Sequence, residues 1–334
     1  MTMLSGLGTG QAARVQPTDT LSGPQWRSLL NRIDEKRCTP FIGSGGCDPD
    51  LVPPPWKIAQ EWSSDAECQY RLGDTTNLPQ VAQYRATNEM IPSEELHRKL
   101  KHAQLANSTN DNDVHRCLAA LPFPLYVCTH YFNFMTEALR ERKKDPRREF
   151  CRWHQDEAMK LALGPTLMEQ EPEYKPSPAN PLVFHLFGLL EQPASMVLTE
   201  DDYLDFLVKT AFDSTTHSSG QVDEPAIPLA VDRAMTNPSL LFLGYRLDDL
   251  EFRVLLRKLI CSRQIRNSMH ITVQMVAVDD STDAEQVHQL QDFVNKYLKY
   301  ISFGVSAYPG TLNDFTTELH QRWEDFDAKA PGDR

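Results

Sequence analysis

Short apolar segments alternate with helical patterns along most of this chain, and this alternation constrains its fold more than any other feature. The clearest segment, Ser-Leu-Leu-Phe-Leu at 239–243, ends at Gly244. Strands that are apolar on both faces are typical of parallel sheets covered by helices on each side. We therefore predict an α/β fold, with a Rossmann-like doubly wound parallel sheet and a smaller, mostly helical layer.

The predicted elements follow from apolar runs for strands and from three- and four-residue apolar spacing for helices. Strands are expected at about 39–42, 125–128, 182–186, 196–198, 239–243, 271–278 and 303–307. Helices are expected from Pro24 to about 33, and at about 56–64, 79–89, 93–105, 112–121, 132–143, 200–212, 247–262, 283–298 and 311–326.

The domain organisation is predicted to be a single domain over residues 22–328. Residues 1–21 show little periodicity and are expected to form a flexible N-terminal arm, and 329–334 a C-terminal tail. Helical insertions are expected at about 53–121 and 144–181. The second of these is first basic and then rich in proline, so no strand is predicted within it.

The charge balance limits the classes of partner. The chain has 34 Lys and Arg against 46 Asp and Glu, a net charge of −12. Phosphate backbones and anionic membranes attract basic surfaces, so no direct nucleic-acid partner and no membrane are expected. No apolar run approaches the roughly 20 residues of a membrane span. A small anionic ligand remains possible, because backbone N–H groups can hold one locally.

The seven cysteines of the chain include no CxxC pair. Neither a zinc site nor a disulfide framework is therefore predicted, and no metal is expected. Unpaired cysteines and the absence of a secretory signal pattern favour the reducing cytoplasm.

A glycine-rich turn, Gly43-Ser44-Gly45-Gly46-Cys47, follows the first predicted strand. Glycines let a backbone approach a phosphate closely, and free N–H groups bind it. Glycines are also common in plain tight turns after strands, so both interpretations stay open. The turn is neither GxxxxGK[ST] nor GxGxxG, which argues against a P-loop enzyme and an ordinary dehydrogenase.

Two histidines lie at or near predicted strand ends, where ligands bind in open α/β sheets. His130 follows the strand at 125–128, and His185 lies in the strand at 182–186, where it is expected to share a face with Phe187. Together they would form an acid/base pair, since histidine titrates near neutral pH. The alternative for each is a structural histidine bonded to backbone. Tyr245, after Gly244, is expected at the same crevice.

Four segments, in this order, resemble the sirtuin-like NAD-binding family, and in particular the bacterial type found in defence and signalling proteins. Residues 41–47 resemble the first glycine motif, usually written GAGxS, and 183–188 resemble the strand that carries "HLHG". Residues 197–203 resemble "vLTedDY", and 241–253 resemble "lFlGySlDD..fR". The resemblance extends over about residues 22–326.

The resemblance implies NAD as substrate or ligand, and its departures concern the catalytic positions. The family's "TTNYDD" corresponds to residues 128–133, so that His130 stands where an asparagine is expected. The family has its catalytic histidine at the position directly before Gly188, where this chain has Phe187. His185 lies two residues before Phe187. The zinc ribbon of deacylase sirtuins needs CxxC pairs, so protein deacylation is the least expected family activity.

Three readings follow from this resemblance: NAD hydrolysis, binding of NAD or ADP-ribose without cleavage, and an assembly module. We expect an NAD hydrolase that is the effector of a bacterial anti-phage system, with a non-catalytic binding or scaffold subunit as the alternative. A homo-oligomer is expected, and a ring ATPase or another defence protein is a possible partner by family analogy. The expected catalytic residues are His130 and His185. The expected NAD-binding residues are Gly43, Ser44, Gly45, Cys47, Thr129, Gly188, Gly244 and Tyr245.

Overall fold

The computed structural model describes residues 21–66, 70, 73–108, 113–154, 156–213, 225–246, 250–261, 270–273, 305–308 and 310–328, with isolated residues between 285 and 300. Its centre is a seven-stranded sheet in the order β3-β4-β2-β1-β5-β6-β7, in which every pairing is parallel. The strands are β1 (Cys38–Ile42), β2 (Leu125–Cys128), β3 (Arg147–Phe150), β4 (Leu182–His185), β5 (Ser239–Leu243), β6 (His270–Val273) and β7 (Val305–Tyr308). The predicted α/β fold with a Rossmann-like parallel sheet is thereby confirmed.

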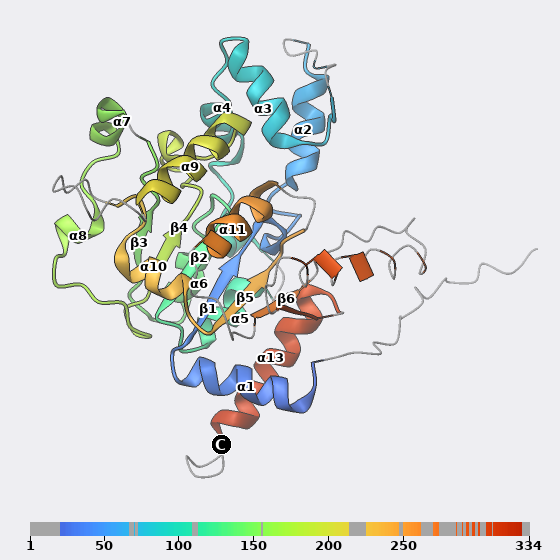
Figure 1. Cartoon of the computed structure of the whole chain (residues 1–334), viewed down its shortest axis with the longest axis vertical. Helices are drawn as coiled ribbons and strands as arrows, with labels where there is room; N and C mark the ends of the chain where they lie inside the picture. Colours follow the sequence, from blue (N-terminus) through green and yellow to red (C-terminus); the bar gives the residue numbers. More distant parts are fainter. Residues whose placement is uncertain are drawn as a thin grey trace, which may run out of the picture.

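Helices cover both faces of this sheet (Figure 1). The helices are α1 (Gly23–Asp34), α2 (Pro55–Ser64), α3 (Leu78–Thr87), α4 (Pro92–Leu100), α5 (Val114–Ala120), α6 (Phe134–Glu141), α7 (Glu157–Ala162), α8 (Leu167–Gln170), α9 (Glu200–Asp213), α10 (Leu229–Met235), α11 (Leu250–Cys261) and α13 (Leu312–Asp327). Short 3₁₀ turns span Ser44–Gly46, Leu105–Asn107 and Pro193–Ser195. Figure 1 shows α2, α3 and α4 grouped at the top, far from α1 and α13.

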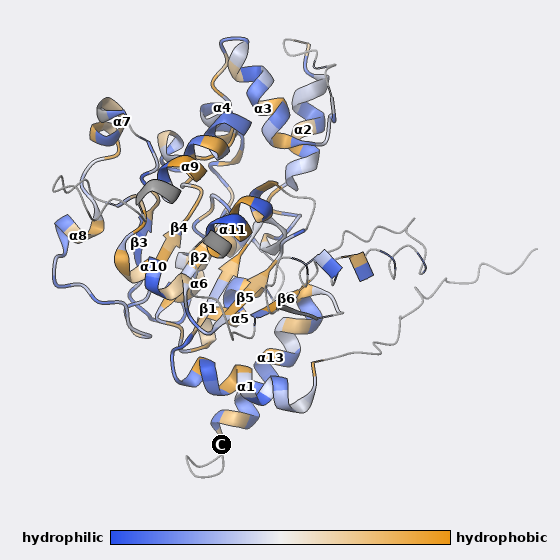
Figure 2. Ribbon diagram, in the orientation of Figure 1, coloured by the Kyte–Doolittle hydropathy of each residue, from blue (hydrophilic) through white to orange (hydrophobic). Residues whose placement is uncertain are grey.

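Successive strand residues point to opposite faces and so build two apolar cores. Phe41 and Phe242 lie in the core shared with α9, α10 and α11, whereas Ile42 and Leu243 lie in the core shared with α1, α5, α6 and α13. Figure 2 shows the central strands mainly as apolar ribbon, between helices that carry both hydrophilic and hydrophobic residues. Full burial of one such side chain is worth about 1.5–3 kcal/mol, so both faces of the sheet stabilise it.

The sequence misses two elements of the fold. The edge strand β3 reads Arg-Arg-Glu-Phe and lies within 144–181, where no strand was expected. An edge strand faces solvent and carries polar side chains, so a search for apolar runs passes over it. The seven-residue helix α10 is too short for a periodic pattern.

Other predictions are wrong in detail or lie outside the described residues. Residues 196–198 form no strand, and α4 ends at Leu100 rather than near 105. The predicted insertion over 53–121 ends in α5, which packs against α6 and α13 as part of the cover of the sheet. Most of the predicted helix at 283–298, residues 274–278 and the terminal segments 1–20 and 329–334 lie outside the described residues.

A search of the described helices for one long and apolar enough to cross a membrane finds none.

Candidate functional site

The strand order places a topological switch point between β1 and β5. From β1 the chain continues to β2 on one side, whereas β5 lies on the other side and leads to β6 and β7. Open parallel sheets bind ligands beyond the carboxyl ends of their strands at such a point. The predicted glycine turn follows β1 and Gly244 follows β5, so both lie at this position.

The two loops at the switch point contact each other directly through backbone. The N–H of Gly43 donates to the carbonyl of Leu243 at 2.8 Å, and that of Gly45 to the carbonyl of Gly244 at 3.0 Å. Gly244 has a φ of +72°, and a Cβ atom there would lie 2.2 Å from the Gly46 nitrogen. These glycines are therefore required for close packing of the two loops.

Most N–H groups of the glycine turn are already bonded, contrary to the expectation of free donors. Those of Gly46 and Cys47 donate to the carbonyls of Gly43 and Ser44, at 3.0 and 3.1 Å. Within the described residues, the donors without a recorded acceptor at this turn are the N–H and hydroxyl of Ser44. A bound anion would therefore contact Ser44 first.

Thr129 and Tyr245 lie beside the turn and join it to the neighbouring strands; both side chains are buried. The Thr129 hydroxyl lies 3.0 Å from the Tyr245 hydroxyl and also contacts Glu251. The ring of Tyr245 is buried, and a Cβ on Gly43 would lie 2.9 Å from it. Burial raises the pKa of Tyr245 well above its ordinary value, so the phenol stays protonated.

Cys47 is the last residue of the turn, and its thiol is a poor nucleophile. Burial, followed by the negative charge of Asp113, raises the pKa of its thiol well above the ordinary value. A thiol that stays protonated does not attack carbon centres.

Gly188 has a different role from the other predicted glycines. Its φ is +92°, and a Cβ there would lie 2.3 Å from the carbonyl oxygen of Ser195. The residue forms the turn after β4 and packs against the 3₁₀ turn at Pro193–Ser195. No contact within the described residues brings it to the glycine turn, so its predicted role in binding NAD gains no support.

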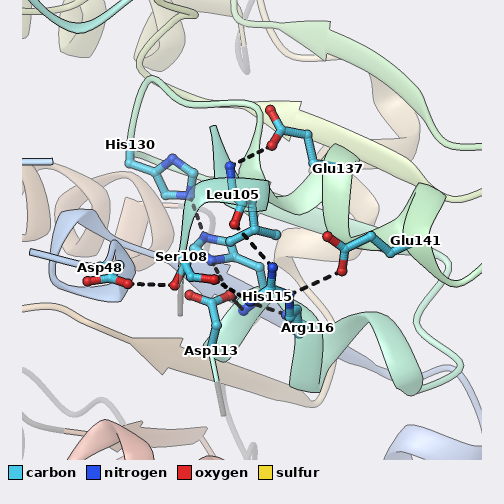
Figure 3. Close-up of polar contacts among 9 residues, drawn as sticks. All are labelled: Asp48, Leu105, Ser108, Asp113, His115, Arg116, His130, Glu137 and Glu141. Atoms are coloured by element: carbon cyan, nitrogen blue, oxygen red, sulfur yellow. Dashed lines mark hydrogen bonds and ion pairs between the residues drawn. The ribbon is translucent and has the colours of Figure 1, made fainter. Parts of the chain in front are cut away.

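His130 lies in a buried hydrogen-bonded chain of side chains rather than in an open crevice (Figure 3). Its Nδ1 accepts the N–H of Phe132 at 3.2 Å, and its Nε2 lies 3.2 Å from Nε2 of His115. Nδ1 of His115 lies 3.0 Å from Oδ1 of Asp113. Burial, with smaller contributions from His115 and His185, lowers the pKa of His130 well below its ordinary value. The ring is therefore neutral at pH 7.

His185 lies next to His130, as the predicted pair requires, and is also buried. Its Nδ1 is 3.4 Å from the carbonyl oxygen of His130, and the two ring centroids are 6.4 Å apart. Among the described residues, its Nε2 has no hydrogen-bond partner. Burial lowers the pKa of His185 to about 4, so this ring is neutral as well.

The expectation that His185 and Phe187 share a strand face is wrong. β4 ends at His185, and the ring of Phe187 packs edge-on against Tyr203 and Phe206 of α9, at 5.3 and 5.1 Å between centroids. Phe187 therefore belongs to the core on the opposite side from the histidines.

A cavity of about 240 Å³ lies beside the glycine turn. Its lining includes Gly45, Cys47 and Asp48 on one side and residues at the start of α13 on the other, with Asp113 between them. Neither His130 nor His185 lines it. Its volume is below the roughly 300–1,000 Å³ of common ligand pockets, so the cavity holds only part of a dinucleotide.

Asp113 and His115 are functional candidates that the sequence analysis missed. Asp113 is the N-cap of α5 and accepts the N–H groups of His115 at 2.8 Å and Arg116 at 3.3 Å. An aspartate before a helical pattern is a recognisable cap signal, but nothing in the sequence indicates that its neighbour contacts His130.

A larger groove of about 630 Å³ runs along the edge strand β3, where the basic run of the sequence is found. Arg147 pairs with Asp145 and Glu171, and Arg148 pairs with Glu191. The lining of the groove holds four arginines and four carboxylates, so it has no excess of positive charge for an anion. Among the described residues, no group of three or more His, Cys, Asp or Glu side chains is arranged to hold a metal ion.

Comparison with known families assigns more than half of the chain to one family. Residues 124–300 match the family model described as SIR2-like domain, a range that begins just before β2 and includes His130, His185 and Gly244. The glycine turn after β1 precedes the matched range. No curated protein matches the chain.

Proposed function

Because the chain belongs to the SIR2-like domain family, we propose that it binds NAD at the β1–β5 switch point and cleaves the nicotinamide–ribose bond. The observation that carries the proposal is the packing of Gly43 and Gly45 against Gly244, next to a cavity at the carboxyl ends of the central strands. Small residues at this point keep side chains away from the place where a dinucleotide would lie.

The donors available at the site fit part of NAD. The hydroxyl and N–H of Ser44 suit a phosphate oxygen, and the carboxylate of Asp48, which lines the cavity, suits a ribose hydroxyl. The cavity is too small for the whole molecule, so binding requires the turn or the start of α13 to move. NAD is therefore expected to change the thermal stability of the protein.

The proposed chemistry is a hydrolysis with His130 as the general base. The bond from ribose C1′ to nicotinamide breaks through an oxocarbenium-like state, a bond forms to a water oxygen, and nicotinamide leaves neutral. Because His130 does not line the cavity, the movement that admits NAD must also bring water to this ring. The proton of the attacking water then goes to His130, whose neutral ring is in the form that accepts it. The products are ADP-ribose and nicotinamide. The neighbouring His185 is proposed to assist His130.

A second candidate is a subunit that binds NAD or ADP-ribose without cleaving it. The burial of both histidines, and the place of Phe187 in the opposite core, favour this alternative. In either case we propose, from the family resemblance, a cytoplasmic role in anti-phage defence, as a homo-oligomer that acts with a ring ATPase or another defence protein.

The test measures nicotinamide release from NAD by the purified full chain. His130→Ala and His185→Ala are expected to lower release at least 100-fold, as loss of a general base does. The matched control is His102→Ala, an exposed histidine outside the site, which should keep full activity. Full activity in both site variants would show that the assignment of the histidines is wrong.

Thermal shift separates the two candidates. A shift with NAD and with ADP-ribose, but no nicotinamide release, would support the binding subunit. No shift with either compound would contradict both candidates and leave the assembly module.

A further inference from the structure

Three buried polar side chains connect the end of β2 to the cavity beside the glycine turn. Figure 3 shows His130, His115 and Asp113 in a row, each within hydrogen-bond distance of the next. All three are almost fully buried, at 2%, 0% and 3% exposure. Burial of polar groups is costly unless each donor meets an acceptor, so the protonation of this row is constrained.

The direction of each hydrogen bond follows from one fixed donor. The backbone N–H of Phe132 donates to Nδ1 of His130, so this nitrogen carries no proton and Nε2 of the neutral ring does. Nε2 of His130 then donates to Nε2 of His115, which leaves the proton of His115 on Nδ1. That proton is donated to Oδ1 of Asp113. Every contact is then a donor–acceptor pair with two neutral rings and one carboxylate.

The charges fit this arrangement. Burial alone raises the pKa of Asp113, but the hydrogen bonds that its carboxylate accepts from the ring of His115 and from the backbone N–H groups of His115 and Arg116 act against burial, and the pKa is lowered overall. The carboxylate is therefore charged where it lines the cavity. His130, at the other end, is neutral.

We propose that Asp113 and His115 are positioning residues that hold His130 in its Nε2–H tautomer and carry a proton from it to the cavity wall. The proposal deepens the proposed NAD hydrolysis and rests on it. A proton from water binds Nδ1 of His130 in place of the Phe132 hydrogen bond. The Nε2 proton passes to His115, and the Nδ1 proton of His115 passes to Asp113. The net change is one proton moved from water to Asp113, whose carboxylate becomes neutral. Both rings end neutral in the opposite tautomers and the N–H of Phe132 loses its acceptor, so the proton must return along the row before the next turnover.

The first test measures tautomers and does not depend on activity. Two-bond ¹H–¹⁵N spectra of protein labelled in its histidines, assigned by single substitutions, should show His130 protonated at Nε2 and His115 at Nδ1. The opposite tautomer at His130 would overturn the proposal whatever the activity. If the protein released no nicotinamide, the proposed hydrolysis and with it the proton route would be wrong, and the spectra would still decide the positioning role.

The second test removes the charge of Asp113 while keeping its shape. Asn is as good an N-cap as Asp and still accepts a hydrogen bond from His115, so Asp113→Asn should preserve the fold. We expect kcat for nicotinamide release to fall at least tenfold, with KM for NAD within about twofold. An unchanged kcat would overturn the proton route.

The matched control is Asp156→Asn. Asp156 caps α7 with the same geometry, accepting the N–H groups of Ala158 at 2.7 Å and Met159 at 3.3 Å. Within the described residues it contacts no histidine. This control should keep kcat, and an equal loss in both variants would mean that a capping effect, not the relay, explains the result. Should Asp113→Asn prove unstable, His115→Gln measured by the same kinetics and spectra replaces it.

Discussion

The glycine side and the histidine side of this site lie at the same edge of the sheet but are built in different ways. At the ends of β1 and β5, backbone packs on backbone, and even a methyl group at Gly244 has no room. At the ends of β2 and β4, ring packs on ring, with His130 and Phe132 stacked at 6.1 Å between centroids. The glycine side is thus determined by shape, and the histidine side by protonation.

This difference predicts different sensitivities. A side that depends on shape should respond strongly to an added atom and little to pH. A side that depends on neutral buried rings should respond to pH, because protonation of a buried imidazole is costly. A strong pH response of the glycine side, or tolerance of an added atom there, would contradict this comparison.

The largest effect is expected for Gly244→Ala. The new Cβ would lie 2.2 Å from the Gly46 nitrogen, so the loops must separate, and we expect a loss of at least about 3 kcal/mol in the free energy of unfolding. Gly164→Ala is the control, because Gly164 has a similar φ of +69° but nothing within 4 Å. It should cost only about 1 kcal/mol. If urea unfolding gave equal losses of unfolding free energy for the two variants, the positive φ, and not the close packing of the loops, would be the reason for glycine at position 244.

The next effect concerns acid sensitivity at His185. Its pKa is about 4 in the folded protein and about 6.5 in the unfolded chain, so between these pH values the unfolded chain binds more protons. The contribution of neutral His185 to the free energy of unfolding is therefore complete above pH 6.5. It is lost as the pH falls towards 4, and the loss amounts to about 3 kcal/mol. His185→Phe should remove that part of the loss.

Urea unfolding at pH 7 and pH 4.5 measures this difference. His102→Gln, a substitution at an exposed position, is the control for loss of a histidine as such. If His185→Phe lost as much stability on acidification as the wild type, the histidine side would not depend on a neutral ring at this position.

A smaller effect is expected for Phe187→His, which restores the residue that the family pattern expects. Because Phe187 packs against Tyr203 and Phe206, the substitution buries a polar ring in an aromatic core and should cost about 2 kcal/mol. Nicotinamide release should not rise. Phe293→His, at an exposed position, should change stability by less than about 0.5 kcal/mol. A rise in release would place residue 187 within reach of the substrate.

The sequence predicted the part of the molecule that depends on repeated local patterns. Uniformly apolar strands such as 239–243, and the glycine turn after β1, were recognisable because burial on both faces and close approach leave direct marks on composition. Thr199 and Asp202 cap the start of α9 with reciprocal hydrogen bonds at 2.8 and 3.1 Å, another feature that depends on local sequence spacing.

What the sequence could not predict depends on contacts between distant elements. The row from Asp113 through His115 to His130 exists because the start of α5 packs beside the end of β2, a three-dimensional relation without a local pattern. Likewise, the separation of Phe187 from His185 follows from β4 ending at His185, whereas an alternating strand pattern predicts one shared face. Strand ends are set by tertiary packing, so periodicity alone assigns faces wrongly there.

The smallest effect tests the boundary between the two sides, at Thr129. Its hydroxyl bonds to the hydroxyl of Tyr245, and the ring of Tyr245 packs against Gly43. Thr129 therefore links the end of β2, which leads to His130, with the glycine side. Thr129→Val keeps the shape and removes the hydroxyl, and should cost about 1 kcal/mol because Tyr245 and Glu251 each lose this hydrogen-bond partner. Thr129→Ser keeps the hydroxyl and should recover at least half of that loss. If Thr129→Val also shifted the tautomer of His130, the two sides would be coupled rather than independent, because one lost hydrogen bond at the shape-determined side would then alter protonation at the other.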